Sequence, residues 1–328
     1  MSDSLVRIAV IGAGRLASEH AKALKLLNNV EIVGVCSRTW GSGERFAREF
    51  GIKECAITTE VSNLFSLTRA DVVIVAVSEE SIYEVSTKVF ENPWVILLEK
   101  PAGLDFDEAK SLAHLASIRS QGTYVALNRR HYGNIKLVLA DVQSKGGKRI
   151  VQVSDQQWTR DALSRGGVRD LSLNWMYVNA IHTIDLVRYF CRGAIERVMT
   201  TGWMPGVEPR IVSAVIDFSS GDRATYQGIW DASGPWAVAL TTQAGRWEMT
   251  PLERTNFLSA GAGEKVQWED ALEDQMVKAG LLVQAQNLIQ AVHGELHDLV
   301  TIQDSLDTMR LIDSIYFPRM TGRWISDE

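Results

Sequence analysis

The sequence is poor in cysteine and proline, has no long apolar run and carries no excess of positive charge. Its three cysteines lack CxxC spacing, so it indicates neither a disulfide framework nor a zinc cluster, and we expect a reducing, cytoplasmic setting. No apolar run reaches the roughly 18 residues of a membrane helix, and 46% hydrophobic residues with only 7 prolines argue against disorder. The net charge of -6 gives no reason to expect nucleic acid as a partner.

The beginning of the sequence reads as a buried strand. Residues 1–14, MSDSLVRIAVIGAG, lack the basic start, long apolar core and small-residue cleavage site of a signal peptide. At 328 residues the chain exceeds one comfortable hydrophobic core, so we expect two domains, at residues 1–128 and 129–328.

The first of these segments alternates between apolar strands and helices. Strands are expected at 5–11, 30–38, 54–57, 70–77, 94–101 and 123–130. Helices are expected between them at 15–27, 41–51, 79–91 and 105–122. Strands rich in Val, Ile and Leu that alternate with helices predict a parallel sheet covered on both faces, which is an α/β fold.

A glycine loop follows the first strand and precedes the first helix. Residues 12–17 spell GxGxxA, in which Gly12 allows a tight turn and Gly14 lets a pyrophosphate approach the backbone. Ala17 lets the helix pack on the strand, and the helix N-terminus, with Arg15 and Leu16, faces the phosphates. The loop therefore predicts dinucleotide binding; a purely structural turn is the alternative.

The end of the second strand favours NADP over NAD. An NAD enzyme usually has an acidic residue there, whereas this strand ends in Ser37, Arg38 and Thr39. The two hydroxyls can donate to a 2′-phosphate, and the Arg38 guanidinium can pair with it. The alternative is that Arg38 is a solvated residue at a helix start, which leaves the cofactor open.

Another candidate site is LLEKPAG, at the carboxyl end of a predicted parallel strand. Ligands bind at this edge of open α/β sheets, and the segment contains Glu99, Lys100 and Pro101. The Lys100 ammonium could stabilise the alkoxide that forms as hydride leaves a substrate alcohol. A solvent-exposed lysine without such a role is the alternative.

These motifs in this order and spacing resemble the Gfo/Idh/MocA family of sugar and cyclitol oxidoreductases. The resemblance rests on GxGxxA followed by SEHAKAL, on ADVVIVAV and EKPAG, and on NRR at 128–130 and HTID at 182–185. It implies an N-terminal Rossmann domain and a C-terminal α/β domain with a large open, mainly antiparallel sheet. It also implies a homodimer or homotetramer assembled through that sheet.

The same resemblance assigns the catalytic residues. It implies that His182 is the general acid/base, and we expect Asp185 to orient the imidazole, while Glu99 and Lys100 lie beside the cofactor. On a regular helix Asn179, His182 and Asp185 share one flank that faces a cleft, and Ile181, Ile184 and Val187 face the core. Without the family resemblance, the alternative interpretation is that His182 is a buried histidine that serves packing.

The chain departs from the family pattern at one position. Many members have an acidic residue four positions before the histidine, but this chain has Val178 there. Asn179 could supply a substrate hydrogen bond, and Tyr177 or Asp170 could approach from nearby. An enzyme that uses Lys100 and His182 remains the first hypothesis, and a catalytically silent dinucleotide-binding sensor is the second.

The substrate class follows from the basic residues and the resemblance. The run NRRHYG contains Asn128 and Arg130 as expected substrate ligands, and a loop supplies Arg160, Arg165 and Arg169. Such residues bind a phosphate or carboxylate, or are a solvated surface. The runs NRRHY and NWMYVNAIHTIDL resemble members of amino-sugar and surface-polysaccharide biosynthesis, so we expect a sugar, nucleotide sugar or polyol as substrate. His, Asp and Glu do not cluster in metal-ligand spacing, so no metal is expected.

The second segment reads as hairpins followed by helices. Strands are expected at 149–159, 195–204, 210–221, 223–231 and 236–245, with turn signals between several of them, and helices at about 270–292 and 301–316. This pattern predicts an antiparallel sheet. Eight of the ten tryptophans lie after residue 128, among them Trp158, Trp175, Trp230 and Trp236, and subunit packing is favoured over a sugar platform.

Overall fold

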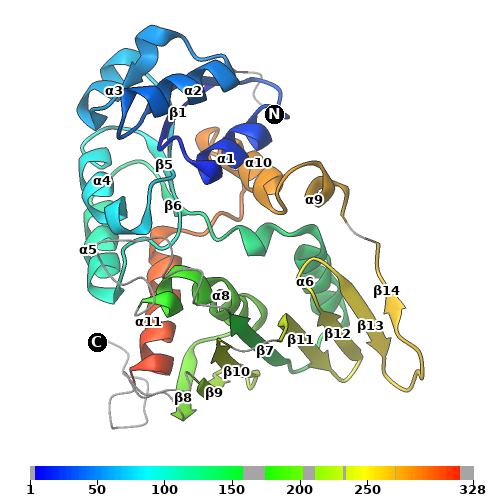
Figure 1. Cartoon of the computed structure of the whole chain (residues 1–328). Helices are drawn as coiled ribbons and strands as arrows, with labels where there is room; N and C mark the ends of the chain where they lie inside the picture. Colours follow the sequence, from blue (N-terminus) through cyan, green and yellow to red (C-terminus); the bar gives the residue numbers. More distant parts are fainter. Residues whose placement is uncertain (1–3, 158–173, 202–210, 232–233, 270, 318–328) are drawn as a thin grey trace. The chain divides into compact units, whose positions relative to one another are not determined.

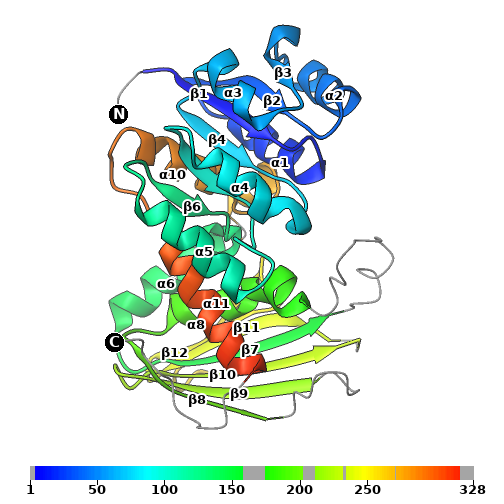
Figure 2. The same cartoon turned by 90° about the vertical axis from the view of Figure 1, so that its left-hand side faces the viewer.

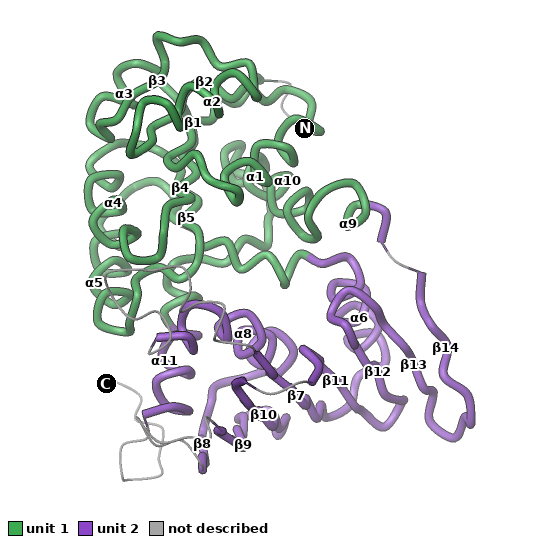
Figure 3. Tube along the Cα trace, in the orientation of Figure 1, with its two compact units in different colours: residues 1–131, 273–306 green, residues 132–272, 307–328 purple. Residues whose placement is uncertain are grey.

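A computed structural model of the protein describes residues 4–157, 174–201, 211–231, 234–269 and 271–317 (Figures 1 and 2). The chain divides into two compact units (Figure 3). Unit 1 comprises Met1–His131 with Glu273–Leu306, and unit 2 comprises Tyr132–Leu272 with Asp307–Glu328. Among the described residues, no helix has the length and apolar character needed to cross a membrane.

Unit 1 contains a six-stranded parallel sheet in the order β3-β2-β1-β4-β5-β6. Its strands are β1 (Val6–Ile11), β2 (Val30–Cys36), β3 (Ile57–Thr58), β4 (Val72–Val75), β5 (Val95–Leu98) and β6 (Thr123–Val125). The strand order reverses between β1 and β4, which is the topological switch point of a Rossmann fold. The predicted Rossmann domain is confirmed, with each strand shorter than its apolar run because the run continues into the turn.

Helices cover both faces of this sheet (Figure 2). They are α1 (Arg15–Leu24), α2 (Trp40–Phe50), α3 (Val61–Thr68), α4 (Ile82–Val89), α5 (Phe106–Ser117) and α10 (Leu281–Val292). The 3₁₀ turns of unit 1 are η1 (Glu54–Ala56), η2 (Glu79–Ser81) and η3 (Asn128–His131), and a short helix α9 (Leu272–Met276) precedes α10.

The segment Glu273–Leu306 differs from the expected division at 128/129, because it belongs to unit 1. Leu281, Ala285 and Leu288 of α10 are buried in one apolar cluster with Ala17 and Ala21 of α1. Burial of this apolar surface explains why the chain returns to unit 1 near its C-terminal end. The sequence predicted one continuous second domain, because the helical pattern of α10 does not indicate which hydrophobic core this helix packs against.

Unit 2 contains an eight-stranded sheet in the order β14-β13-β12-β11-β7-β10-β9-β8. Among the described strands of this sheet, only β7 and β10 pair in parallel, so the predicted large, mainly antiparallel sheet is confirmed. The strands are β7 (Ile150–Gln157), β8 (Ile195–Thr201), β9 (Ile211–Phe218), β10 (Arg223–Trp230), β11 (Trp236–Thr242), β12 (Gly245–Met249), β13 (Thr255–Ser259) and β14 (Val266–Gln267).

One face of this sheet is buried and the other is open. Buried residues alternate with half-buried or exposed ones along β7, β9 and β10, as the period of two in a strand requires. The helices α6 (Gly133–Lys145), α8 (Ile181–Phe190) and α11 (Ile302–Tyr316) lie on one side of the sheet (Figure 1). Residues that point to these helices therefore build the core of unit 2.

Asp222 ties three segments together at the start of β10. Its buried carboxylate accepts the backbone N–H of Arg149 at 2.9 Å, just before β7, and the backbone N–H of Arg192 at 3.0 Å, just after α8. The Arg192 guanidinium adds bonds from Nε at 2.9 Å and Nη2 at 2.8 Å. Burial alone would raise the pKa of Asp222, but the bonds from Arg192 and Arg149 outweigh burial and lower the pKa to about 2.

This geometry predicts a pH-dependent contribution to stability. Because the folded pKa of Asp222 is below its usual 3.8, the carboxylate stabilises the fold above about pH 4, and this contribution is lost as the pH falls towards 2. In urea unfolding followed by circular dichroism, Asp222→Asn should unfold more easily than wild type at pH 7, with the difference shrinking below pH 4. Glu264→Gln, at an exposed turn, is the control and should match wild type. A difference that stays constant from pH 7 to pH 3 contradicts the assignment.

Candidate active site

The glycine loop lies between β1 and α1, at the switch point of the parallel sheet. Gly12 has φ of 106°, and a Cβ there would lie 2.1 Å from the carbonyl oxygen of Ala76, just after β4. Its N–H donates to the carbonyl of Cys36 at the end of β2, at 2.8 Å. Both the left-handed backbone and the close approach to Ala76 therefore require glycine at this position.

No described residue lies close enough to position 14 to require a glycine there. Gly14 is the N-cap of α1 with an extended backbone, and a Cβ there would meet no atom within 4 Å. No side chain caps this helix end, and its first turn has no acidic residue. Uncapped N–H groups with open space beside the backbone match the demands of a pyrophosphate, so this loop fits a dinucleotide.

The three residues after β2 differ in exposure. Ser37 is buried, and its hydroxyl donates to the Thr39 carbonyl at 2.8 Å. The Thr39 hydroxyl donates to Ser42 Oγ at 2.9 Å. Arg38 is exposed. Since both hydroxyl hydrogens are used within the protein, Arg38 is the strongest of these candidates for an anionic group.

Glu99 is held by a residue that sequence reasoning missed. Its carboxylate is 5% exposed and lies 2.6 Å from Nε2 of the buried His20 of α1. The backbone N–H of Lys100 donates to the other Glu99 oxygen at 3.2 Å. Glu99 thus connects the turn after β5 to α1. The signal for His20 was present in SEHAKAL, but its partner lies 79 residues away in the chain.

Several cationic side chains lie near Lys100, together with the Glu99 carboxylate. Lys278, which the sequence did not single out, is half-buried, and burial lowers its pKa. The positive charges of Arg129, Arg15 and Lys100 lower this pKa further, in decreasing order, while the negative charge of Glu99 raises it. Unit 1 therefore gathers lysines and arginines from four separate segments at the edge that carries the glycine loop. No local sequence pattern links residue 278 to this edge.

Two predicted substrate ligands lie in η3 of unit 1. The buried Asn128 donates from Nδ2 to the Ala279 carbonyl at 2.9 Å and accepts from Arg129 Nη1 at 2.7 Å. These bonds attach η3 to the segment before α10. Arg130 is half-buried. Asn128 thus uses its amide within the protein, which leaves Arg130 as the better candidate for contact with a substrate.

The helix that carries the histidine is not uniform. Residues Met176–Ala180 form a π-helical turn, η4, and the α-helix begins at Ile181. The expected regular spacing is therefore wrong for Asn179, because a π turn is wider than an α turn, whereas His182 and Asp185 both lie in the α-helix. Such turns are frequent at functional sites.

Burial on this helix also differs from the expected two-sided pattern. Ile181, Ile184 and Val187 face the core as predicted, but His182 and Asp185 are only 3% and 1% exposed. They contact protein instead of lining an open flank: the His182 ring lies edge-on to Trp236, with centroids 6.2 Å apart and an interplanar angle of 83°. Asp185 accepts a bond of 2.8 Å from the Thr308 hydroxyl of α11.

Position 178, where many family members have a carboxylate, is occupied by a buried apolar side chain. Val178 is 4% exposed within η4. Tyr177, a candidate to replace the acid, is buried and donates to Asp313 of α11 at 3.3 Å. Asn179 is half-buried and donates to Gln157 of β7 at 2.7 Å. Within this helix, Asn179 is therefore the polar residue of the predicted set that retains exposed surface.

Several sequence candidates lie outside the described residues. They are Trp158, Arg160, Arg165, Arg169 and Asp170. Of the other tryptophans, Trp175 and Trp230 are buried and Trp236 is half-buried. Trp230 packs against Tyr316 with ring centroids 5.6 Å apart. These indoles thus contribute to the core of unit 2.

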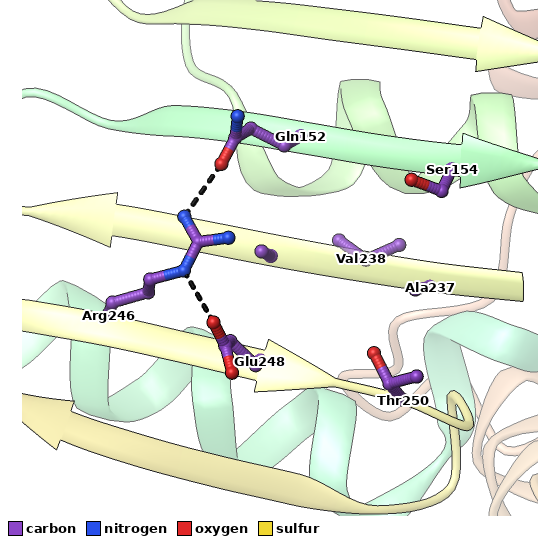
Figure 4. A pocket seen from close by; sticks show the side chains of 8 residues that line it. Gln152, Ser154, Ala237, Val238, Arg246, Glu248 and Thr250 are labelled. Atoms are coloured by element: carbon purple, nitrogen blue, oxygen red, sulfur yellow. Dashed lines mark hydrogen bonds and ion pairs between the residues drawn. The ribbon is translucent and has the colours of Figure 1, made fainter. Parts of the chain in front are cut away.

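A hollow of about 300 Å³ lies on the open face of the unit 2 sheet (Figure 4). Arg246 crosses it and donates to Gln152 at 2.6 Å and to Glu248 at 2.8 Å. Gln152 and Ser154 of β7 line it, whereas their neighbours Val153 and Asp155 are buried. The hollow contains none of the predicted site residues.

Comparisons with known proteins agree with this architecture. The sequence profile of an oxidoreductase family with an NAD-binding Rossmann fold, Gfo/Idh/MocA, matches residues 6–127. Glucose-6-phosphate 3-dehydrogenase of Bacillus subtilis (strain 168) is 27% identical over 198 residues, covering 56% of this chain and 53% of that protein. Inositol 2-dehydrogenase of Rhizobium meliloti (strain 1021) is 22% identical over 253 residues, covering 74% and 66%.

The chain thus spans between about half and two thirds of the length of these two curated relatives. A dehydrogenase structure from Chromobacterium violaceum superposes with a TM-score of 0.81 at 18% identity, covering 95% of this chain and 94% of that one. At this identity the likeness concerns the fold. The glycine loop, the strand order and the family profile agree, so residues 6–127 match the NAD-binding Rossmann domain of the Gfo/Idh/MocA oxidoreductase family, and the chain as a whole has the fold of such dehydrogenases.

Proposed function

We propose that this protein transfers a hydride between NADP and a ring carbon of a sugar, nucleotide sugar or related polyol. The observation that carries the proposal is the geometry of the glycine loop. The carbonyl of Ala76 requires glycine at position 12, whereas position 14 has open space beside its backbone and is the N-cap of a helix whose N-terminus no side chain caps. The backbone N–H groups of this turn bind the pyrophosphate. Arg38, exposed after β2, binds the 2′-phosphate.

The chemistry is divided between two residues. A bound nicotinamide supplies the hydride acceptor or donor at its C4. In the oxidative direction, the Lys100 ammonium stabilises negative charge on the substrate oxygen, and the His182 imidazole accepts the hydroxyl proton. In the reductive direction the same imidazole returns the proton to that oxygen. Asp185, with its hydrogen bond from Thr308, orients the helix that carries His182.

An anionic sugar is the substrate class that suits the charges. The two relatives named above act on glucose 6-phosphate and inositol, as their names state. In this chain Lys278, Arg129 and Lys100 form cationic surroundings in unit 1. A nucleotide sugar or sugar phosphate provides the negative charge that such a group stabilises, and Arg130 and Asn179 are its proposed further ligands.

A second candidate function is a catalytically silent dinucleotide sensor. It is favoured by one observation: the buried Val178 stands where many family members have a carboxylate. We also propose that the protein is cytoplasmic and forms a dimer or tetramer through the unit 2 sheet, whose open face is half-buried to exposed along β7 and β10. Light scattering after size-exclusion chromatography tests the oligomeric state.

The first experiment separates enzyme from sensor. Purified protein is titrated with NADPH, NADP, NADH and NAD by fluorescence, and the bound reduced cofactor is then challenged with a panel of keto-sugars and nucleotide sugars. Reoxidation establishes an oxidoreductase and its substrate class. Tight cofactor binding without turnover across the panel favours the sensor.

Arg38→Ala should weaken NADP binding by about tenfold or more, because a charge-assisted bond to phosphate contributes roughly 1.5–3 kcal/mol. NAD, which lacks the 2′-phosphate, should change by less than about threefold. Arg48→Ala is the matched control: Arg48 is an exposed arginine of α2 whose guanidinium pairs with Glu44 at 3.2 Å. An equal loss for both cofactors would refute the 2′-phosphate assignment.

His182→Ala should lower kcat by about 10²- to 10⁴-fold, the usual contribution of a general acid/base, and leave the Kd for NADPH near wild type. His114→Ala, at an exposed position on α5, controls for loss of a histidine and should retain full activity. Circular dichroism checks that the cavity left by the buried imidazole has not unfolded unit 2. Loss of cofactor binding together with turnover would make His182 a structural residue.

A further inference from the structure

Asp155 is a fully buried carboxylate in β7 that no sequence pattern singled out. Four side chains place a donor group against it, and they come from four elements of unit 2; the single hydroxyl hydrogen of Thr183 is shared with the Ala180 carbonyl at 2.9 Å. The donors are Tyr226 of β10 at 2.7 Å, Thr183 of α8 at 3.0 Å, Trp236 of β11, and Gln157 at the end of β7. A carboxylate has acceptor sites for four hydrogen bonds, so this shell is complete.

The two oxygens have different partners. Oδ1 accepts from Trp236 Nε1 and Gln157 Nε2, which are N–H groups that can only donate. Oδ2 faces the hydroxyls of Tyr226 and Thr183. Burial raises the pKa of Asp155, while the bonds from Tyr226, Trp236, Gln157 and Thr183 oppose that rise. An amide at this position could keep its oxygen towards the two N–H donors and turn its NH₂ towards the hydroxyls, which can also accept. Only removal of both oxygens therefore leaves the N–H donors without an acceptor.

One branch of this shell leads to His182. Trp236 is the cross-strand partner of Asp155 in the β7–β11 pair, so both side chains share the buried face of the sheet. The bond from its Nε1 to Asp155 fixes the indole, and the indole lies edge-on to the His182 ring. Thr183, the residue after His182, adds a second connection to Asp155.

The other branch leads to Asn179. Because Gln157 Nε2 points at Asp155, its Oε1 points the other way. That oxygen accepts from Asn179 Nδ2 at 2.7 Å and from Trp175 Nε1 at 2.5 Å. Asp155 and the Trp175 indole N–H thus together fix which way the Gln157 amide is turned, and the turned amide holds Asn179 in the π-helical turn.

We propose that Asp155 is a positioning residue that orients His182 through Trp236 and Asn179 through Gln157. The kinetic part of this inference rests on the proposed oxidoreductase function, whereas the structural part does not. Asp155 differs from the family's missing acid at position 178, because it acts through these two side chains from a fully enclosed place in the sheet.

The test is an NMR experiment on the whole chain labelled at the Cε1 of its six histidines. The His182 resonance is assigned by its loss in His182→Ala. Because an indole ring shifts the resonances of protons close to it, Asp155→Ala, which removes both acceptor oxygens, should move the His182 signal by several times the linewidth. Asp222→Ala, which alters another buried carboxylate of unit 2, is the matched control and should leave that signal in place.

A His182 signal that stays in place in folded Asp155→Ala, or that moves equally in Asp222→Ala, would overturn the proposal. A second measurement on the wild-type chain covers the case in which Asp155→Ala does not fold. The Trp236 indole N–H, assigned through Trp236→Phe, should be shifted downfield and exchange with solvent at least tenfold more slowly than the indole N–H of an unstructured peptide. Free exchange at the peptide rate also overturns the proposal.

Kinetics complete the experiment. With the substrate found in the reoxidation panel, Asp155→Ala should lower kcat by about tenfold with the Kd for NADPH unchanged, whereas Asp222→Ala should retain kcat. Unchanged kcat in folded Asp155→Ala counts against a positioning role. If no substrate turns over with wild type, the proposed function fails, while the His182 and Trp236 signals still decide whether Asp155 orients these rings.

Discussion

The contact between Gly12 and the end of β4 is the constraint on which unit 1 depends. A side chain at position 12 would overlap the carbonyl of Ala76, so the chain turns there with a positive φ and enters α1 immediately. The turn lies where the strand order reverses between β1 and β4. The helix N-terminus, the turn after β5 and the arginine after β2 then all lie at the carboxyl edge of one sheet.

Local patterns in the sequence predicted the parts of the fold that local forces determine. The apolar runs and the glycine loop predicted the parallel sheet and α1, and turn signals such as SSGDR predicted the β9–β10 hairpin. The destination of α10 was not predictable, because an amphipathic helix packs equally well on any apolar core. α10 packs against α1 although the contacting residues lie about 260 positions apart in the chain. The same tertiary contact brings Lys278, just before α10, close to Arg15 and Lys100.

The candidate site shows the same division. Lys100 and His182 were predicted because each lies in a short motif, but the residues that contact these motifs come from other elements: His20 contacts Glu99, the neighbour of Lys100, and Trp236 contacts His182. Strand register brings Trp236 opposite Asp155, and no single-sequence pattern gives register between β7 and β11. The π-helical turn at Met176–Ala180 was also invisible, since its apolar residues read as an ordinary helix.

The surroundings of the buried Asp155 bear on the proposed chemistry, and they differ from those of Asp222, which accepts from the Arg192 guanidinium. The donors to Asp155 that the structure describes are neutral side chains. Neutral donors keep their hydrogen bonds when a nearby imidazole changes its charge, whereas a cation paired with Asp155 would add its own field to that titration. A framework of this kind can hold His182 in one orientation through both halves of a proton transfer. It also makes an apolar Val178 compatible with an acid/base histidine, because the imidazole is oriented from the sheet side instead of from its own helix.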